Sequence, residues 1–223
     1  MSFNIAIDGP AGAGKSTIAK LVAKELKAIY VDTGAMYRAM ALYLIKQGIS
    51  GDDKEKIEKA CENADISIEY RDGNQIVLLN GEDVTPRLRD EEVGNMASKS
   101  SAIGKVREKL VSLQQELAKK ADVVMDGRDI GTVVLPGADL KIYLTASVDE
   151  RAKRRYNELI QKGEEADLEV IKKEIAERDE RDMTREISPL KKADDAALID
   201  SSFMTIDEVC EAIMFKAERI KNV

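Results

Sequence analysis

Short apolar runs and helical stripes alternate over the first fifty residues of the chain. Residues 3–7 form an apolar run that ends at Asp8, and from Lys15 onward apolar side chains recur at the three- and four-residue spacing of one helix face. A second short run at residues 29–31 is followed by another helical stripe, which ends near Gly48. The chain is therefore predicted to begin as strand, helix, strand, helix.

The pattern changes after a charged helix that we predict for residues 53–64. Residues 66–79 alternate apolar and polar positions on either side of a turn at residues 71–74, as an antiparallel hairpin does. A third strand is expected around residues 83–85. We predict that residues 66–93 are an antiparallel insertion that forms a small mobile or substrate-facing subdomain.

The alternation of strands and helices returns after the insertion. A long amphipathic helix is predicted over residues 103–117, and residues 149–182 are almost entirely charged helix with a break at Gly163. The remaining buried-type strands are predicted at residues 123–125, 140–144 and 198–200, with a final amphipathic helix after them. The fold class is therefore α/β, with a mostly parallel five-stranded sheet, helices on both faces and right-handed crossovers.

Charge and residue usage limit the chemistry that this fold can carry. The 223 residues include 35 Lys and Arg against 42 Asp and Glu, and the net charge of −7 argues against a nucleic-acid or membrane-surface partner. The chain has no His and two Cys, which excludes His general bases, His metal ligands and four-cysteine zinc sites. No apolar run approaches the roughly 18 residues of a membrane span, and the start of the chain lacks a signal-peptide pattern. We expect a cytoplasmic protein that works through carboxylates, Lys, Arg, hydroxyls or backbone groups.

Residues 9–16, GPAGAGKS, match the phosphate-binding pattern GxxxxGK(S/T) between a predicted strand and a predicted helix. Glycines let successive N–H groups face an anion, and the helix N-terminus adds positive potential. Lys15 would bridge phosphates and Ser16 would ligate magnesium. The alternative is a glycine-rich turn that binds nothing. The predicted ATP-binding residues are Gly9, Pro10, Ala11, Gly12, Ala13, Gly14, Lys15, Ser16 and Thr17.

Three further features could serve a second substrate, and each also has a plainer structural interpretation. DTGAMYR at residues 32–38 follows the second strand, but its Arg38 could be solvated on a capped helix. DGRD at residues 126–129 places two carboxylates and a guanidinium after a buried strand, but it could be a tight turn with a surface ion pair. Two arginine trios are spaced to share a helix face, as they would also be on a solvated helix with acidic partners: Arg151, Arg154 and Arg155, and Arg178, Arg181 and Arg185.

Together these motifs resemble the bacterial-type cytidylate kinases, a family of P-loop nucleoside monophosphate kinases. The resemblance covers nearly the whole chain, and the stretches that carry it are IDGPAGAGKST at residues 7–17, DTGAMYR at 32–38, DGRDIGTVVLP at 126–136, ERDERDMTR at 177–185 and SPLKKADDA at 188–196. The resemblance implies a single P-loop kinase domain over residues 1–223, with its core in 1–65, 94–148 and 186–223. Residues 66–93 would be the NMP-binding insertion and residues 149–185 an arginine-rich helical lid.

The resemblance also implies roles for individual residues. The residues expected to face the cytosine are Ser98, Arg107 and Asp129, and those expected to face the ribose are Arg178 and Asp182. The acceptor phosphate would be held by Arg38, Arg128 and Arg185, and Thr33 and Tyr37 complete the CMP-binding set. The implied catalytic residues are Lys15, Arg128, Arg154, Arg178 and Arg185, with the choice between Arg154 and Arg155 at the transferred phosphoryl group left open. Because a carboxylate accepts from the amino group of cytosine but meets an oxygen in uracil, we expect CMP to be preferred over UMP.

The expected reaction is the transfer of the γ-phosphoryl group of ATP to CMP, with Mg²⁺ as cofactor and dCMP as a second acceptor. The acceptor phosphate is already anionic, so no general base is needed, which suits a chain without His. Two alternatives remain: a P-loop kinase for UMP, dTMP or a small alcohol, and a GTP-dependent switch, although the guanine-reading motif NKxD is missing. We expect a monomer whose partners are small-molecule nucleotides, with no nucleic-acid or membrane partner.

Overall fold

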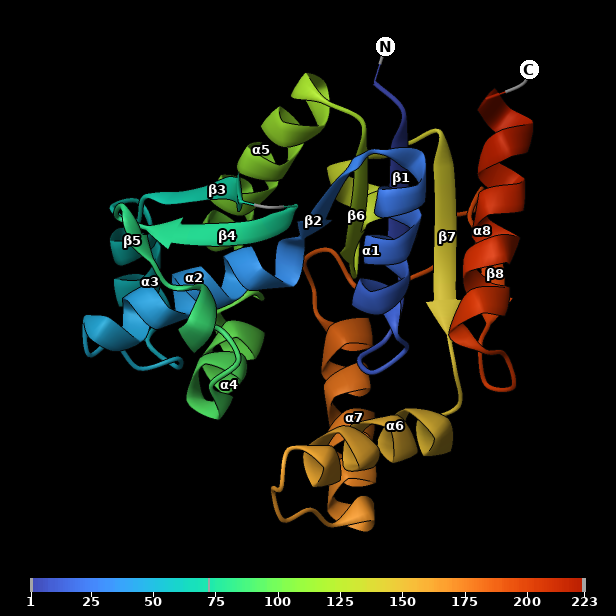
Figure 1. Ribbon diagram of the computed structural model, residues 1–223. Coiled ribbons are helices and arrows are strands. Elements are labelled where there is room, and N and C mark those ends of the chain that lie inside the picture. Colours follow the sequence, from blue (N-terminus) through green and yellow to red (C-terminus); the bar gives the residue numbers. More distant parts are fainter. Residues whose placement is uncertain (1, 72, 222–223) are drawn as a thin grey trace. The chain divides into compact units, whose positions relative to one another are not determined.

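The computed structural model describes residues 2–71 and 73–221, and its chain forms two compact units (Figure 1). Unit 1 comprises Met1–Tyr30 and Ala121–Val223, and unit 2 comprises Val31–Lys120. Each unit has an apolar core of its own. Asp72, which belongs to the turn predicted within the hairpin, lies outside the described residues.

Unit 1 is built on a five-stranded sheet in the order β2-β6-β1-β7-β8. The strands are β1 Asn4–Asp8, β2 Ile29–Asp32, β6 Val123–Gly127, β7 Leu140–Thr145 and β8 Ala197–Asp200. β1 lies parallel to both neighbours, with Ile5 opposite Val124 on one side and Leu140 on the other, and β7 and β8 are also parallel. The carboxyl ends of β6, β1, β7 and β8 therefore share one edge of the sheet, where open α/β folds place their ligands. The predicted fold class is confirmed.

Helices complete unit 1 in two places. α1 (Lys15–Leu26) and α8 (Ile206–Lys221) lie beside each other over one face of the sheet, where Ile18 and Ile213 join the strand side chains in the core (Figure 1). α6 (Val148–Gln161) follows β7 and packs on α7 (Leu168–Thr184) through a small apolar cluster. Across the described residues, no helix is long and apolar enough to cross a membrane.

Unit 2 combines helices with a small antiparallel sheet. Its elements are α2 Thr33–Lys46, α3 Lys54–Cys61, β3 Ile66–Arg71, β4 Asn74–Leu79, β5 Glu82–Asp83, the 3₁₀ turn η1 Thr85–Arg87, α4 Glu91–Ser100 and α5 Gly104–Lys120. The sheet order is β3-β4-β5, and Ile66 pairs with Leu79 as the hairpin predicts. The short third strand ends at Asp83, where the prediction had it begin.

The hairpin shares its core with the helices of unit 2. Ile66, Val77 and Leu79 are buried in the same apolar cluster as Met40 of α2 and Leu110 of α5. The strands predicted as an insertion at residues 66–93 thus belong to a larger compact unit, because alternate side chains of the hairpin turn inward to pack on the helices.

Candidate active site

The phosphate-binding loop of unit 1 connects β1 to α1 and requires glycine at several positions. Gly9, Gly12 and Gly14 all have positive φ angles, of 150°, 75° and 87°. A Cβ atom at Gly9 would overlap the carbonyl oxygen of Leu144 in β7. The loop can therefore approach the sheet closely and present its backbone, which is what an anion-binding loop needs.

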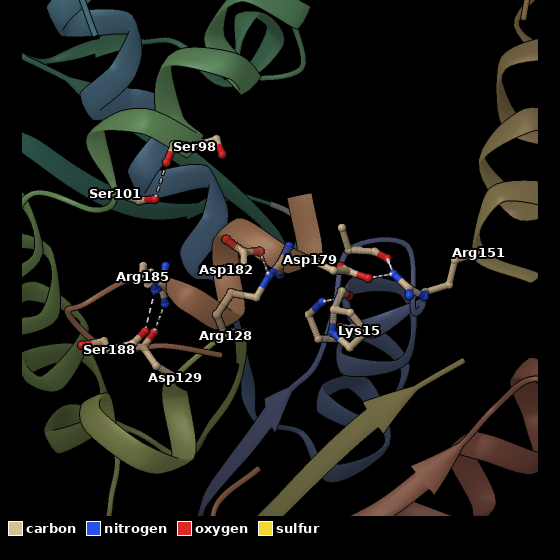
Figure 2. Close-up of polar contacts among 12 residues, drawn as sticks. Lys15, Ser98, Ser101, Arg128, Asp129, Arg151, Asp179, Asp182, Arg185 and Ser188 are labelled. Atoms are coloured by element: carbon tan, nitrogen blue, oxygen red, sulfur yellow. Dashed lines mark hydrogen bonds and ion pairs between the residues drawn. The ribbon is translucent and has the colours of Figure 1, made fainter. Parts of the chain in front are cut away.

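Lys15 opens α1 and is buried beneath the loop. Its Nζ donates to the carbonyl oxygen of Pro10 at 2.7 Å (Figure 2). Burial, and after it the neighbouring Arg128 guanidinium, lowers the pKa of Lys15 to about 7, although Asp126 opposes this shift. Since Lys15 is buried with guanidinium groups near it, an added anion such as a phosphate is favoured here.

Ser16 and Asp126 form the oxygen-rich part of the loop region. The Ser16 hydroxyl donates to one carboxylate oxygen of Asp126 at 2.9 Å, and the Tyr30 hydroxyl donates to the other at 2.9 Å. Asp126 is buried at the carboxyl end of β6. A hydroxyl and a carboxylate beside a phosphate-binding loop are the hard oxygen donors that Mg²⁺ prefers, so these residues fit the expected cofactor.

Asp8, the last residue of β1, ties the loop region to the turn after β6. Its carboxylate accepts from the backbone N–H groups of Ile130 and Gly131, both at 2.7 Å. Burial raises the pKa of Asp8 to about 6, although the two N–H donors oppose this shift. Because the same turn carries Arg128 and Asp129, Asp8 holds two predicted site residues in place.

The DGRD segment lies in a buried charge network. Arg128 Nε donates to Asp182 of α7 at 2.8 Å, and Arg185 lies 3.8 Å from Asp129 (Figure 2). Burial by itself raises the pKa of Asp182, but the surrounding arginines, led by Arg128, bring it below its usual range. Asp126 and Asp129 are both at most 5% exposed, so the alternative of a surface ion pair for this segment is wrong.

Arg185 does not share a helix face with Arg178 and Arg181, as the spacing had predicted. α7 ends at Thr184, and Arg185 follows in an extended conformation that lets its Nε donate to the carbonyl oxygen of Ser188 at 2.6 Å. Arg181 is exposed, whereas Arg178 is half-buried. The arginine trio is therefore split by the end of the helix, which the sequence spacing could not reveal.

The arginines of α6 differ sharply in their surroundings. Arg155 is 47% exposed and pairs with Glu158 at 2.9 Å. Arg154 donates to the backbone oxygen of Ser201 at 2.6 Å and to its hydroxyl oxygen at 3.2 Å. It also lies close to Gly14, because a Cβ atom added to that glycine would be 3.9 Å from one of the terminal nitrogens of Arg154. Arg154 is thus the one of this pair that lies beside the phosphate-binding loop.

Unit 2 carries the remaining predicted CMP-binding residues. Asp32 caps α2 by accepting from the Ala35 N–H at 2.9 Å, and Thr33 is buried in the first turn. The Arg107 guanidinium of α5 lies 5.5 Å from the ring centre of Tyr37 and donates to the carbonyl oxygen of Ser101 at 3.3 Å.

Two further CMP-binding candidates of unit 2 lie on helices. Ser98 is half-buried on α4, and its carbonyl oxygen accepts from the Ser101 hydroxyl at 3.1 Å (Figure 2). Arg38 is half-buried on α2. Its guanidinium lies close to Gly34, because a Cβ atom added to that glycine would be 3.2 Å from one of the terminal nitrogens of Arg38. Arg38 is therefore partly shielded from solvent, and its contact with the acceptor phosphate stays a prediction.

Comparison with known proteins identifies the family. The family model for cytidylate kinase matches residues 5–219. A cytidylate kinase of Caldicellulosiruptor bescii is 56% identical over 212 residues, which cover 95% of this chain and 94% of that protein. The chain belongs to the cytidylate kinase family. Another member, from Streptococcus pneumoniae, is 52% identical over 219 residues and 98% of each chain.

The fold also occurs outside the cytidylate kinase family. A gluconokinase from Sinorhizobium meliloti superposes with a TM-score of 0.51 at 11% identity, covering 98% of this chain and 93% of that one. At this identity the likeness concerns the fold alone. The family resemblance deduced from five separate motifs is thus confirmed by matches that run through the whole chain.

Some side chains that organise the site were not predicted. Asp8 and Tyr30 were missed, although Asp8 ends an apolar strand directly before the glycine-rich loop, a position that marks it in the sequence. Asp179 was also missed, because its partner Arg151 lies 28 positions away along the chain. Only the packing of α6 on α7 reveals that pair.

Proposed function

We propose that this protein transfers the γ-phosphoryl group of ATP to CMP, giving ADP and CDP, and that dCMP is a second acceptor. One observation carries this function: the chain matches cytidylate kinases from end to end at above 50% identity. The geometry of unit 1 supports it, because Asp129 is buried beside Arg185 just after β6. A carboxylate in such a site can accept from the amino group of cytosine but not from the corresponding oxygen of uracil.

ATP would bind through its phosphates at residues 9–17. The loop N–H groups and the Lys15 ammonium would stabilise the negative charge that builds up on the transferred phosphoryl group. Arg154, which lies beside Gly14, is our choice for the lid arginine at that group. Since Arg155 faces solvent and pairs with Glu158, it has no such role in this proposal.

Ser16 would hold Mg²⁺, together with phosphate oxygens and water. When bound there, Mg²⁺ would supply charge neutralisation at the phosphates of the nucleotide. Asp126 accepts from the Ser16 hydroxyl and so keeps that oxygen turned to the loop.

The residues predicted to bind CMP are Thr33, Tyr37, Arg38, Ser98 and Arg107 of unit 2, and Arg128, Asp129, Arg178, Asp182 and Arg185 of unit 1. The nucleophile is a phosphate oxygen of CMP, which is anionic at neutral pH, so catalysis consists of positioning and charge neutralisation. A cytoplasmic location and a monomeric state stay predictions, as does the division of the chain into core, insertion and lid.

The test is ADP release from ATP and Mg²⁺ with CMP, dCMP, UMP, AMP and dTMP supplied separately. Turnover with CMP and dCMP, and turnover with UMP lower by at least an order of magnitude, is the expected result. Equal turnover of CMP and UMP would contradict the role given to Asp129. Turnover only with UMP, dTMP or an alcohol would favour the neighbouring kinase function, and no turnover with intact ATP binding would favour the nucleotide switch.

A further inference from the structure

Arg151 of α6 is a buried arginine with no place in the proposed chemistry. It is 4% exposed, and its guanidinium reaches three oxygen atoms from separate parts of unit 1. Nε donates to the carbonyl oxygen of Ala146 at 2.9 Å, and Nη1 donates to that of Ala11, also at 2.9 Å. Nη1 also lies 2.6 Å from the carboxylate of Asp179 on α7 (Figure 2).

Asp179 of α7 is the acidic partner of Arg151. Asp179 is 7% exposed, and its second oxygen, Oδ1, is buried without a hydrogen-bond donor among the described residues. A buried carboxylate with one oxygen unsatisfied depends strongly on its cationic partner. Asp179 therefore acts together with the two carbonyl oxygens in fixing where the Arg151 guanidinium lies.

The contact to Ala11 acts directly on the phosphate-binding loop. In a planar trans peptide, the carbonyl of Ala11 and the N–H of Gly12 point in opposite directions. When Arg151 holds the Ala11 carbonyl, it therefore turns the Gly12 N–H the other way. The loop also rests on the arginine stem, since a Cβ at Gly12 would lie 3.2 Å from the Cβ of Arg151.

We infer that Arg151, oriented by Asp179, is a positioning residue that sets the loop peptide at Ala11–Gly12 in the orientation that receives the phosphates of ATP. Asp179 in α7 thereby acts on ATP binding without contacting the nucleotide. The helix that carries the proposed ribose contacts Arg178 and Asp182 thus also controls the shape of the ATP loop. This inference rests on the proposed function only in taking ATP as the loop's ligand.

The test measures binding and kinetics in four variants of the full chain: Arg151→Met, Arg151→Lys, Asp179→Asn and the Arg151→Met/Asp179→Asn double variant. Calorimetry with the β,γ-imido analogue of ATP and Mg²⁺ gives the Kd, and steady-state kinetics give KM for ATP and for CMP. We expect Arg151→Met and Asp179→Asn each to raise the Kd of the ATP analogue roughly 10-fold. We expect Arg151→Lys to have a smaller effect, because it keeps the charge but loses the forked donors.

Two comparisons separate positioning from general damage. KM for CMP should change less than about twofold, and the double variant should bind the ATP analogue no more weakly than Arg151→Met, because both substitutions remove one interaction. The matched controls are Arg155→Met on α6 and Glu180→Gln on α7, both exposed, which should leave the ATP analogue's Kd unchanged.

Three results would overturn the inference. Unchanged ATP binding in Arg151→Met and Asp179→Asn would show that the contact between Arg151 and the loop does not affect ATP binding. Effects that multiply in the double variant would mean that Arg151 acts without Asp179, as a residue touching ATP itself would. Parallel losses in ATP and CMP affinity would mean that the pair only holds the fold.

Asp179→Asn keeps the side-chain shape and serves as the deciding variant if Arg151→Met does not fold. Because analogue binding needs no acceptor, a protein inactive on CMP would disprove the proposed function and still test this inference.

Discussion

The two units handle charge in opposite ways. Of the buried charged side chains described, all but one belong to unit 1: Asp8, Lys15, Asp126, Asp129, Lys141, Arg151, Asp179 and Asp182. Arg107 is the exception in unit 2. Both units have an apolar core, and that of unit 2, which α2, α5 and the hairpin form, has few buried charges beside it.

Burying charge is costly unless each group is paired, so charge is retained where it serves a purpose. In unit 1 the buried groups surround the phosphate-binding loop and the turn after β6, where they orient one another. In unit 2 stability comes from close apolar packing. Substitutions of the buried charges of unit 1 should therefore impair catalysis, and substitutions within the apolar cluster of unit 2 should lower stability.

The largest effect is expected from Lys15→Ala. Removing the ammonium leaves the phosphates without their central positive charge, so kcat/KM should fall on the order of 1,000-fold. The melting temperature should shift little, because Lys15 is held by one backbone oxygen and its charged form is disfavoured by burial. Lys24→Ala, an exposed position on the same helix, is the control. Near-normal turnover in Lys15→Ala would refute the site.

Leu110→Ala tests the contrast from the side of unit 2. Leu110 is fully buried in the apolar cluster, so its truncation should lower the free energy of unfolding by about 2–5 kcal/mol. The Kd for the ATP analogue should not change in protein that remains folded. Urea unfolding and calorimetry measure the two quantities, and a stable protein with weakened ATP binding would contradict the contrast.

Arg185→Ala should lower kcat/KM for CMP by about 100-fold, because it removes a cation from the acceptor phosphate. The Kd of the ATP analogue should stay within a factor of about two, since Arg185 belongs to the acceptor side in our proposal. Arg185→Lys, which keeps a charge beside the buried Asp129, should recover part of the activity and guards against a folding defect. Unchanged CMP kinetics would remove Arg185 from the site.

The smallest effect is a pH dependence caused by Asp8. Its folded pKa is about 6, above the ordinary 3.8, so the folded state binds the proton more tightly. The stability that this proton binding contributes is fully present below pH 3.8 and is lost as the pH rises through 6. Between pH 5 and 7 this group should lower the free energy of unfolding by about 1 kcal/mol.

Asp8→Asn should remove that decline. Urea unfolding at pH 5, 6 and 7 gives the change of the free energy of unfolding with pH for each protein. This change does not depend on any pH-independent effect of the substitution on stability. Identical pH profiles would show that Asp8 does not titrate in this range.

The helix α4 shows where local pattern fails. Residues 91–100 contain Gly94, Asn95 and two serines, which have weak helix propensity, and Val93 and Ala97 are the buried apolar side chains. Both side chains lie in the apolar cluster of unit 2. Tertiary packing therefore stabilises a helix that the residues themselves favour little.

The sequence by itself determined the strand and helix alternation and the phosphate-binding loop. Both depend on residues that are near neighbours in the chain: apolar spacing for the first, and Gly, Lys and Ser in one short segment for the second. The five family motifs were equally visible, and they were enough to indicate the kinase family.

Only the tertiary structure decided what each arginine does. Arg151 and Arg155 lie one turn apart on α6, yet Arg151 is buried against the loop and Asp179 while Arg155 faces solvent. Both arginines belong to the same charged helix, so the difference comes from which side of α6 packs on α7 and on the loop. Such contacts join residues far apart in the chain, and they depend on the folded position of every element between them.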